Sequence, residues 1–277
     1  MSDKSDITDH YTSGELLERL YAALREDGAD PEAPTIEALA PYDQFHGRGL
    51  DSTEQLAAGL AVEPHHHLLD VGSGIGGPAR YISSKFGCII TGIDLTPEFC
   101  DVARHLTQAM GLERRVSFEQ GNALAMPFAG EQFDGAYSMN VSMNIEDKAG
   151  FYGEIFRVLK AGGWLVLSEV AQGPGGAITY PSPWARTAES SFLVTPEETR
   201  EGLEASGFEV TGMRDNIAES KAFAAKVREL VDRGEKPPHR AVSLIHGDLG
   251  DEAAKNMAEG SRNKCVVPIE VMCRKPG

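Results

Sequence analysis

The stretch Leu68-Leu69-Asp70-Val71-Gly72-Ser73-Gly74-Ile75-Gly76-Gly77 decides the fold of this chain. Its first residues are typical of a buried strand, its glycines are typical of a tight turn, and Pro78 follows where a helix begins. A strand, a glycine turn and a helix in this order form the start of a βαβ unit. The stretch therefore predicts a parallel sheet.

Apolar runs of β type and helical segments alternate along the rest of the chain, which is typical of a sheet with helices on both faces. The runs that predict strands lie at 68–71, 89–93, 116–120, 133–138, 164–168, 208–213 and 266–273. The segments that predict helices lie at 78–86, 97–110, 148–159 and from Thr195 to Gly207. We therefore expect an α/β fold with a doubly wound, mainly parallel, Rossmann-like seven-stranded sheet.

Two segments interrupt or precede this alternation. An amphipathic helix begins the chain behind Thr12 and Glu15, which have the spacing of a capping box, and its apolar stripe is Leu16, Leu17, Leu20, Tyr21 and Leu24. A polar segment with a Pro237-Pro238 break separates the last two strands. We expect an N-terminal helical cap at 1–62, a core at 63–214, a lid insertion at 215–264 and a final core strand at 265–277.

A Gly- and Pro-rich stretch at 170–194 is too long for a simple connection. It contains Tyr180, Trp184 and Phe192 and follows the carboxyl end of a predicted strand. Loops at this end of a parallel sheet commonly cover a ligand, so we expect the stretch to border a binding site.

Composition excludes several classes of partner. The 26 Lys and Arg against 42 Asp and Glu give a formal charge of −16, and such a field repels nucleic acid and anionic membranes. No apolar run approaches the ~20 residues needed to cross a bilayer, and the opening residues lack the order of a signal peptide. We expect a cytoplasmic protein that acts on a small molecule, and a homo-oligomer is compatible with the sequence.

No metal site is expected. His65, His66 and His67 alternate between the two faces of an extended strand and therefore make a poor chelate. The chain also contains no H-E-x-x-H motif and no cysteine cluster.

The glycine turn is compatible with two kinds of cofactor. Gly72, Gly74 and Gly77 satisfy the G-x-G-x-x-G pattern of nicotinamide-binding folds, and Asp94 ends the second predicted strand, where an acid holds ribose hydroxyls. Asp70 discriminates between them, because a carboxylate beside the turn repels a pyrophosphate. S-adenosylmethionine carries no phosphate, and its sulfonium and ammonium are cationic, so charge favours this methyl donor.

The stretch Leu69-Asp70-Val71-Gly72-Ser73-Gly74-Ile75-Gly76 resembles the first motif of class I S-adenosylmethionine-dependent methyltransferases. Further stretches resemble the family's second-strand acid, adenine-side turn, fourth strand and turn into the fifth strand, in that order: Ile93-Asp94-Leu95, Gly121-Asn122-Ala123, Phe133-Asp134 and 157–163. The resemblance covers roughly 67–213 and implies that S-adenosyl-L-methionine is the cofactor.

A closer resemblance reaches outside the core. This chain resembles one small-molecule branch of the family at 10–14, 43–46, 74–80 and 141–145. That branch contains sarcosine and dimethylglycine N-methyltransferases and relatives of quinone-pathway C-methyltransferases. This branch implies a small acceptor and places residues of the N-terminal cap near the site.

The resemblance implies a set of cofactor-binding residues. Glycines of the turn let the backbone approach the methionine portion, Asp70 supports the ammonium, and Asp94 accepts both ribose hydroxyls. The alternatives are a turn without a ligand and a solvated strand-end acid. Asn122 stands where the family commonly has Asp, and Asn140 is either the floor beneath the sulfonium or an ordinary loop residue. The expected set is Asp70, Gly72, Ser73, Gly74, Gly76, Asp94, Leu95, Asn122, Ala123 and Asn140.

Candidate residues also exist on the acceptor side. A phenol at Tyr11 over the sulfonium directs the methyl group and adds a cation–π contact, and His46 is a second candidate base. Their alternatives are a packed aromatic residue and a structural histidine. The candidate substrate-binding residues, which are alternatively turn or surface-loop residues, are Gln44, Arg48, Trp184 and Arg186.

We therefore expect methyl transfer to a small polar molecule. The resemblance to sarcosine and dimethylglycine enzymes implies N-methylation of a glycine-type amine, and an arginine fork at Arg48 or Arg186 could grip the carboxylate of such an acceptor. C- or O-methylation of a quinol, phenol or natural product is the alternative. From other classes, a nicotinamide oxidoreductase and a non-catalytic S-adenosylmethionine-binding protein remain open.

Overall fold

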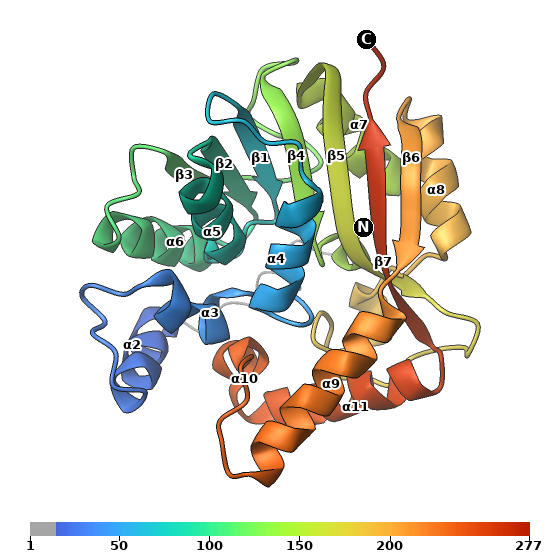
Figure 1. Ribbon diagram of the computed structural model, residues 1–277. Coiled ribbons are helices and arrows are strands. Elements are labelled where there is room, and N and C mark those ends of the chain that lie inside the picture. Colours follow the sequence, from blue (N-terminus) through green and yellow to red (C-terminus); the bar gives the residue numbers. More distant parts are fainter. Residues whose placement is uncertain (1–14) are drawn as a thin grey trace.

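A seven-stranded sheet forms the centre of the computed structural model, which describes residues 15–277 apart from the side chains of His246 and Asp248 (Figure 1). The strand order is β3-β2-β1-β4-β5-β7-β6, and β7 runs antiparallel to both neighbours while the other pairs are parallel. The expected doubly wound fold is therefore confirmed. The strands are β1 (His67–Val71), β2 (Ile89–Asp94), β3 (Val116–Gln120), β4 (Phe133–Met139), β5 (Leu159–Gln172), β6 (Glu209–Asp215) and β7 (Val266–Arg274).

Helices cover both faces of this sheet because the residues of each strand alternate in direction. Leu69 and Val71 of β1 are buried in one apolar cluster with α7 (Lys148–Val158) and α8 (Pro196–Ala205). Leu68 is buried in a second cluster with α5 (Gly77–Phe86), α6 (Pro97–Ala109) and α4 (Leu50–Gly59). Packing on both faces of the sheet therefore fixes β1, whose carboxyl end leads into the glycine turn.

The described N-terminal segment is helical. It contains α2 (Leu16–Glu26) and α3 (Ile36–Asp43), followed by α4. The predicted apolar stripe of α2 faces inward, and Leu16, Leu20, Tyr21 and Leu24 are buried. Thr12, the expected cap of this helix, lies outside the described residues, and Glu15 at the N-cap makes no side-chain capping bond.

The segment between β6 and β7 is also helical. It contains α9 (Ile217–Asp232), α10 (Ala241–His246), the 3₁₀ turn η3 (Gly247–Leu249) and α11 (Gly250–Arg262). Figure 1 shows these helices at the same end of the sheet as α2 and α3, which is the carboxyl end of the parallel strands. The segment is therefore placed beside the ends of the strands on which sites of this fold are built.

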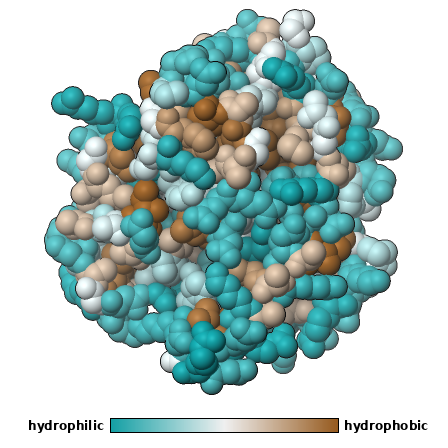
Figure 2. Space-filling view, viewed as in Figure 1, coloured by the Kyte–Doolittle hydropathy of each residue, from teal (hydrophilic) through white to brown (hydrophobic). Residues whose placement is uncertain are grey.

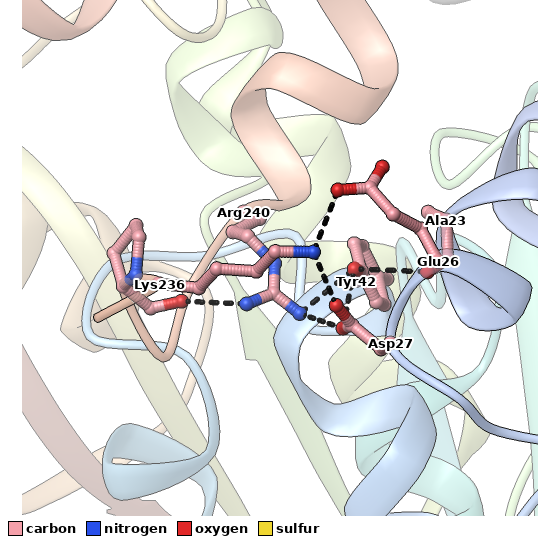
Figure 3. A network of polar contacts seen from close by, with 7 residues as sticks. Ala23, Glu26, Asp27, Tyr42, Lys236 and Arg240 are labelled. Atoms are coloured by element: carbon pink, nitrogen blue, oxygen red, sulfur yellow. Dashed lines mark hydrogen bonds and ion pairs between the residues drawn. The ribbon is translucent and has the colours of Figure 1, made fainter. Parts of the chain in front are cut away.

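A polar network joins this segment to the N-terminal helices (Figure 3). The carboxylate of Asp27 accepts the Tyr42 hydroxyl and the Lys236 ammonium, each at 2.7 Å, and also binds the guanidinium of Arg240. That guanidinium lies 4.6 Å from the centroid of the Tyr42 ring, and the Arg240 backbone N–H donates to Pro41 O at 2.7 Å. The Asp27 carboxylate thus joins the N-terminal helices to the segment between β6 and β7, about 200 residues later in the chain.

Two sequence-based boundaries need correction. The sequence predicts the fifth strand at 164–168, but β5 spans Leu159–Gln172, because Leu159 pairs with Phe133 of β4 and β7 pairs with β5 from Trp164 to Gln172. The long loop consequently begins after Gln172 and not at Val170. Long-range pairing decides this difference, since the partner strand supplies hydrogen bonds that local composition does not reveal.

The exposed surface is mostly polar. Figure 2 shows hydrophilic residues over most of the face seen in Figure 1, with a band of hydrophobic residues across its upper part. No helix among residues 15–277 is long and apolar enough to cross a membrane.

Candidate active site

A cavity of about 590 Å³ lies at the carboxyl ends of the central strands. The glycine turn after β1, the end of β2, the turn after β3 and the loop between β4 and α7 form its wall, and one residue comes from the segment between α3 and α4. Its lining residues are Phe45, Gly72, Gly74, Ile93, Asp94, Leu95, Thr96, Phe99, Gly121, Asn122, Ala123, Leu124, Met139, Asn140, Val141, Asn144, Ile145, Glu146 and Asp147.

The glycine turn is packed so closely that side chains do not fit. Gly72 has φ 74°, and a Cβ there would lie 2.2 Å from Val141 Cγ2. The backbone N–H groups of Gly72 and Ser73 donate to Ile93 O at 2.8 and 3.0 Å, which ties the turn to the end of β2. Backbone alone therefore faces the cavity at Gly72.

Asp94 connects the glycine turn to the start of α6. Its Oδ2 accepts the N–H of Gly74 at 2.8 Å, and its Oδ1 accepts the N–H of Thr96 at 2.9 Å. Burial raises the pKa of Asp94, although these two hydrogen bonds act in the opposite direction. Each oxygen keeps a second lone pair for a ligand, so the side chain is placed both to shape the turn and to accept hydroxyl groups in the cavity.

Asp70 lies directly below the same turn. It is 2% exposed, and its Oδ2 accepts no hydrogen bond of ordinary geometry among the described residues, although the buried Tyr137 hydroxyl is near enough to act against the rise in its pKa. A second cavity of about 20 Å³ adjoins the turn and is lined by Asp70, Ser73 and His46, among others. Burial raises the pKa of Asp70 to about 8. The sequence-based charge argument treated Asp70 as ionised, whereas burial favours its neutral form until a cation compensates the cost.

The adenine-side expectation falls on a compact turn. Asn122 and Ala123 line the cavity together with Leu95. The Asn122 Oδ1 accepts the N–H of Leu124 at 3.1 Å, so this amide oxygen shapes the turn. Its second lone pair and the amide NH₂ stay available to a ligand.

The loop after β4 forms the opposite wall. Asn140 lines the cavity and has φ 58°, a left-handed conformation that few residues other than glycine adopt. Glu169 of β5, which is 3% exposed, accepts the next two backbone N–H groups, those of Val141 and Ser142, at 3.1–3.3 Å. The Lys148 ammonium donates to the carbonyls at Ser142, Ile145 and Phe192. Glu169 thus holds the start of the loop after β4, and Lys148 holds carbonyl groups along the rest of it.

Several predicted residues do not line the main cavity. Gly76 is the N-cap of α5, where a Cβ would lie 2.3 Å from Phe118. Gln44 is buried, and Arg48 donates to Gln55 and Ser52. Trp184 is buried in an apolar cluster under the long loop and donates to Ser191, while Arg186 is exposed and is absent from the lining. Tyr11 lies outside the described residues.

His46 lines only the smaller cavity. It is 5% exposed, its Nε2 lies 3.1 Å from Thr53 Oγ1, and its Nδ1 lies 3.4 Å from Gly47 O. Burial lowers its pKa to about 3, so the ring is neutral at neutral pH. A neutral ring has one N–H, which can serve only one of these two acceptors, and neither ring nitrogen lines the main cavity; this suits a structural role better than that of a base.

Sequence reasoning missed Phe45, Phe99, Glu169 and Lys148. The resemblance at 43–46 implies Gln44 and His46 as candidates, whereas the residue of this stretch that lines the main cavity is Phe45. Glu169 and Lys148 carry no local signal, because their role depends on the loop that the fold brings between them.

The site fits S-adenosylmethionine. The unpartnered Asp70 oxygen and the carboxylate of Asp94 suit a ligand with cationic groups and ribose hydroxyls. The side-chain-free turn at Gly72 leaves room for a close backbone approach. The residues that would hold the donor are therefore Asp70, Gly72, Gly74, Asp94, Leu95, Asn122, Ala123 and Asn140.

Comparisons with known proteins agree with this fit. The family model described as a methyltransferase domain matches residues 69–167. The O-methyltransferase resE of Aspergillus sclerotiorum is 33% identical over 269 residues, which cover 93% of this chain and 92% of that protein. Of five other curated relatives that it matches, the chain spans only 32% to 58% of the length.

Solved structures share the fold. The [4+2]-cyclase SpnF has a TM-score of 0.72 at 22% identity, with 99% of this chain and 97% of that chain covered. A putative sarcosine dimethylglycine methyltransferase from Galdieria sulphuraria has a TM-score of 0.67 at 20% identity, with 82% and 86% covered. Because one of these structures is described as a cyclase, the fold alone does not specify the reaction.

Proposed function

Because the chain belongs to the S-adenosylmethionine-dependent methyltransferases, we propose that it transfers a methyl group from S-adenosylmethionine to a small acceptor that is largely apolar and carries no anionic group. A phenol or quinol is the acceptor class that best suits the site. Methylation of its oxygen or ring carbon corresponds to the alternative that the sequence left open.

One observation carries this proposal: among the described residues, no Lys or Arg lines the main cavity. Nine of its side chains are apolar, and its charged side chains are Asp94, Glu146 and Asp147. A carboxylate on the acceptor would lose its hydration there and find no cationic side chain among the lining residues to form an ion pair with, which is costly. A neutral ring would instead be stabilised by burial of its apolar surface.

The donor supplies a methyl group on a positively charged sulfur, so the displacement needs neither a protein nucleophile nor a resident metal. The acceptor's proton leaves as the new bond to oxygen or carbon forms, and the lining carboxylates Glu146 and Asp147 are the side chains that would take it or pass it to solvent. The chain's own residues must bind, orient and exclude water. Asp94 and the glycine turn would hold one end of the donor, and the Asn140–Val141 wall would face the reacting end. Phe45 and Ile145 would exclude water from the acceptor side.

The test is an incubation of the protein with methyl-labelled S-adenosylmethionine and two sets of acceptors. One set contains phenol, catechol and hydroquinone, and the other contains glycine, sarcosine and dimethylglycine. Label in the first set is expected. Label confined to the second set would overturn the acceptor class, and no label in either set would count against small aromatic and amino-acid acceptors alike.

N-methylation of a glycine-type amine is the second candidate. The lining carboxylates Glu146 and Asp147 favour an amine, but the acceptor's own carboxylate would need a cation, and Arg48 and Arg186 are absent from the lining. Isothermal titration calorimetry with NAD tests the oxidoreductase alternative, and we expect no heat of binding. Binding of the donor without turnover would instead indicate a non-catalytic protein.

A further inference from the structure

The segment between α3 and α4 has an unusual pattern of burial. Asp43, Gln44 and His46 are 4%, 1% and 5% exposed, whereas the apolar Phe45 between them is partly exposed. Folding normally buries the aromatic side chain and leaves the polar ones in water. Phe45 packs on the apolar cluster that contains Phe99, yet it stays partly exposed and lines the cavity.

Phe45 lies in the wall of the site. Phe45 lines both the large cavity and the small one, a property shared with Gly72, Gly74 and Met139. Its ring covers the glycine turn, since a Cβ on Gly74 would lie 3.1 Å from Phe45 Cδ2. The ring also meets the edge of Phe99, with centroids 5.2 Å apart. Phe45 therefore stands where the donor turn borders the rest of the cavity.

A buried chain of hydrogen bonds holds the residues on both sides of Phe45. Arg80 of α5 donates to Asp43 at 2.9 Å, Gln44 donates to Asp43 at 2.9 Å, and Thr53 of α4 donates to Gln44 at 2.6 Å. His46 then lies 3.1 Å from the same Thr53 hydroxyl. Every member of the chain is at most 5% exposed.

The backbone of this segment is held as well. His239, from the segment between β6 and β7, lies 2.8 Å from Gln44 O. The Asp43 carbonyl oxygen would lie 2.3 Å from a Cβ on Gly77, so α3 abuts the start of α5 without intervening side chains. Buried ion pairs such as Asp43–Arg80 add little net stability, because desolvation offsets their attraction. Their effect here is to restrict the position of Phe45.

We infer that Phe45 is a specificity-determining residue that limits the size of the acceptor, and that the Arg80–Asp43–Gln44–Thr53–His46 chain is its positioning device. The inference rests on the proposed function, since it assigns Phe45 to the acceptor portion of the methyltransferase site. An aromatic acceptor would stack on or abut the Phe45 ring, and one larger than the space left by the ring would be rejected.

The test compares methylation of phenol, 1-naphthol and 4-phenylphenol by the wild type, Phe45→Ala and Phe45→Leu. The ratio of kcat/KM for 4-phenylphenol to that for phenol should rise at least about tenfold in Phe45→Ala, the range seen when a hydrophobic pocket changes size. The dissociation constant of S-adenosylmethionine should stay within about threefold. Phe45→Leu, which keeps more apolar volume, should give a smaller change in the same direction.

The positioning chain is tested with Thr53→Val, which removes one hydroxyl and no volume. The size ratio should move in the same direction as in Phe45→Ala, although Thr53 does not line the main cavity. A merely structural role would lower the melting temperature and leave the ratio unchanged. Thr211→Val, at an exposed hydroxyl on β6 that donates to Met272 O, is the matched control.

Two outcomes would overturn the inference while leaving methyl transfer intact. In one, the Phe45 variants methylate all three acceptors with the wild-type ratio. In the other, they lose affinity for S-adenosylmethionine without any change in acceptor preference, which would assign the ring to the donor site. Absence of methyl transfer by the wild type to all three acceptors would count against the proposed function itself.

Discussion

The carboxylate of Glu169 accepts the backbone N–H of Val141 with both of its oxygens, at 3.1 and 3.3 Å, and Val141 in turn closes over Gly72. A buried acid on β5 therefore holds one wall of the cavity against the turn that forms the other. Burial raises the pKa of Glu169 to about 7, with the two N–H groups and Lys148 opposing that rise.

This relationship predicts a pH-dependent difference in stability between the wild type and Glu169→Gln. The folded-state pKa is raised, so the wild type gains stability from Glu169 below the unfolded value of about 4.5 and loses it as pH rises towards 7. The wild type should therefore lose up to about 3 kcal/mol relative to the variant between pH 4.5 and 8. Urea unfolding at these pH values measures the difference in the free energy of unfolding between the two proteins. Glu119→Gln, which replaces an exposed acid, is the control.

Asp94→Ala should weaken binding of S-adenosylmethionine. Loss of the ribose hydrogen bonds and of the bond to Gly74 should cost roughly 2–3 kcal/mol, or about 30- to 150-fold in the dissociation constant. Isothermal titration calorimetry measures the affinity. Asp101→Ala, which removes an exposed acid on α6, should bind as the wild type does. An unchanged affinity in Asp94→Ala would refute the role of Asp94.

Binding of S-adenosylmethionine should release a proton from Asp70. With a pKa of about 8, this carboxyl is mostly neutral at pH 7 in the free protein, and a nearby cation would favour its ionised form. Calorimetry at pH 7 in buffers with different ionisation enthalpies reports the number of protons released. Asp70→Asn should abolish the release. Equal proton counts in the two proteins would show that Asp70 does not face the cationic donor.

Asp27 should restrain the helices between β6 and β7. Asp27→Asn removes the charge that faces Lys236 and Arg240 while nearly preserving shape. Because the group is partly exposed, backbone exchange in 233–246 should accelerate by only about two- to tenfold. Hydrogen exchange followed by mass spectrometry measures the change. Asp232→Asn, at an exposed acid on α9, should leave this region unchanged.

The same measurement tests whether 215–264 acts as a lid. Exchange across this segment should slow when S-adenosylhomocysteine and an accepted phenol are added together, because closure would bury backbone groups. Identical exchange with and without these ligands would indicate a permanently ordered covering. The stretch around Tyr11, which lies outside the described residues, is followed in the same experiment.

The sequence by itself predicted the seven strands and the glycine turn at which the cavity lies. Apolar periodicity located all seven strands, and the Gly72–Gly76 turn with Asp94 placed the cavity, because these signals are local and repeat with the period of the element that they form. Gly72 also has φ 74°, a backbone conformation that favours glycine whatever its neighbours, so this requirement is local.

Tertiary structure alone decided the acceptor end. Arg48 and Arg186 looked like carboxylate clamps, but the fold directs Arg48 to Gln55 and leaves Arg186 outside the lining. Phe45 faces the cavity because Arg80 and Thr53, from two other helices, hold the polar residues beside it. Burial and long-range partners determine where a side chain lies and whether it is charged, and neither is encoded in the residues adjacent to it in sequence.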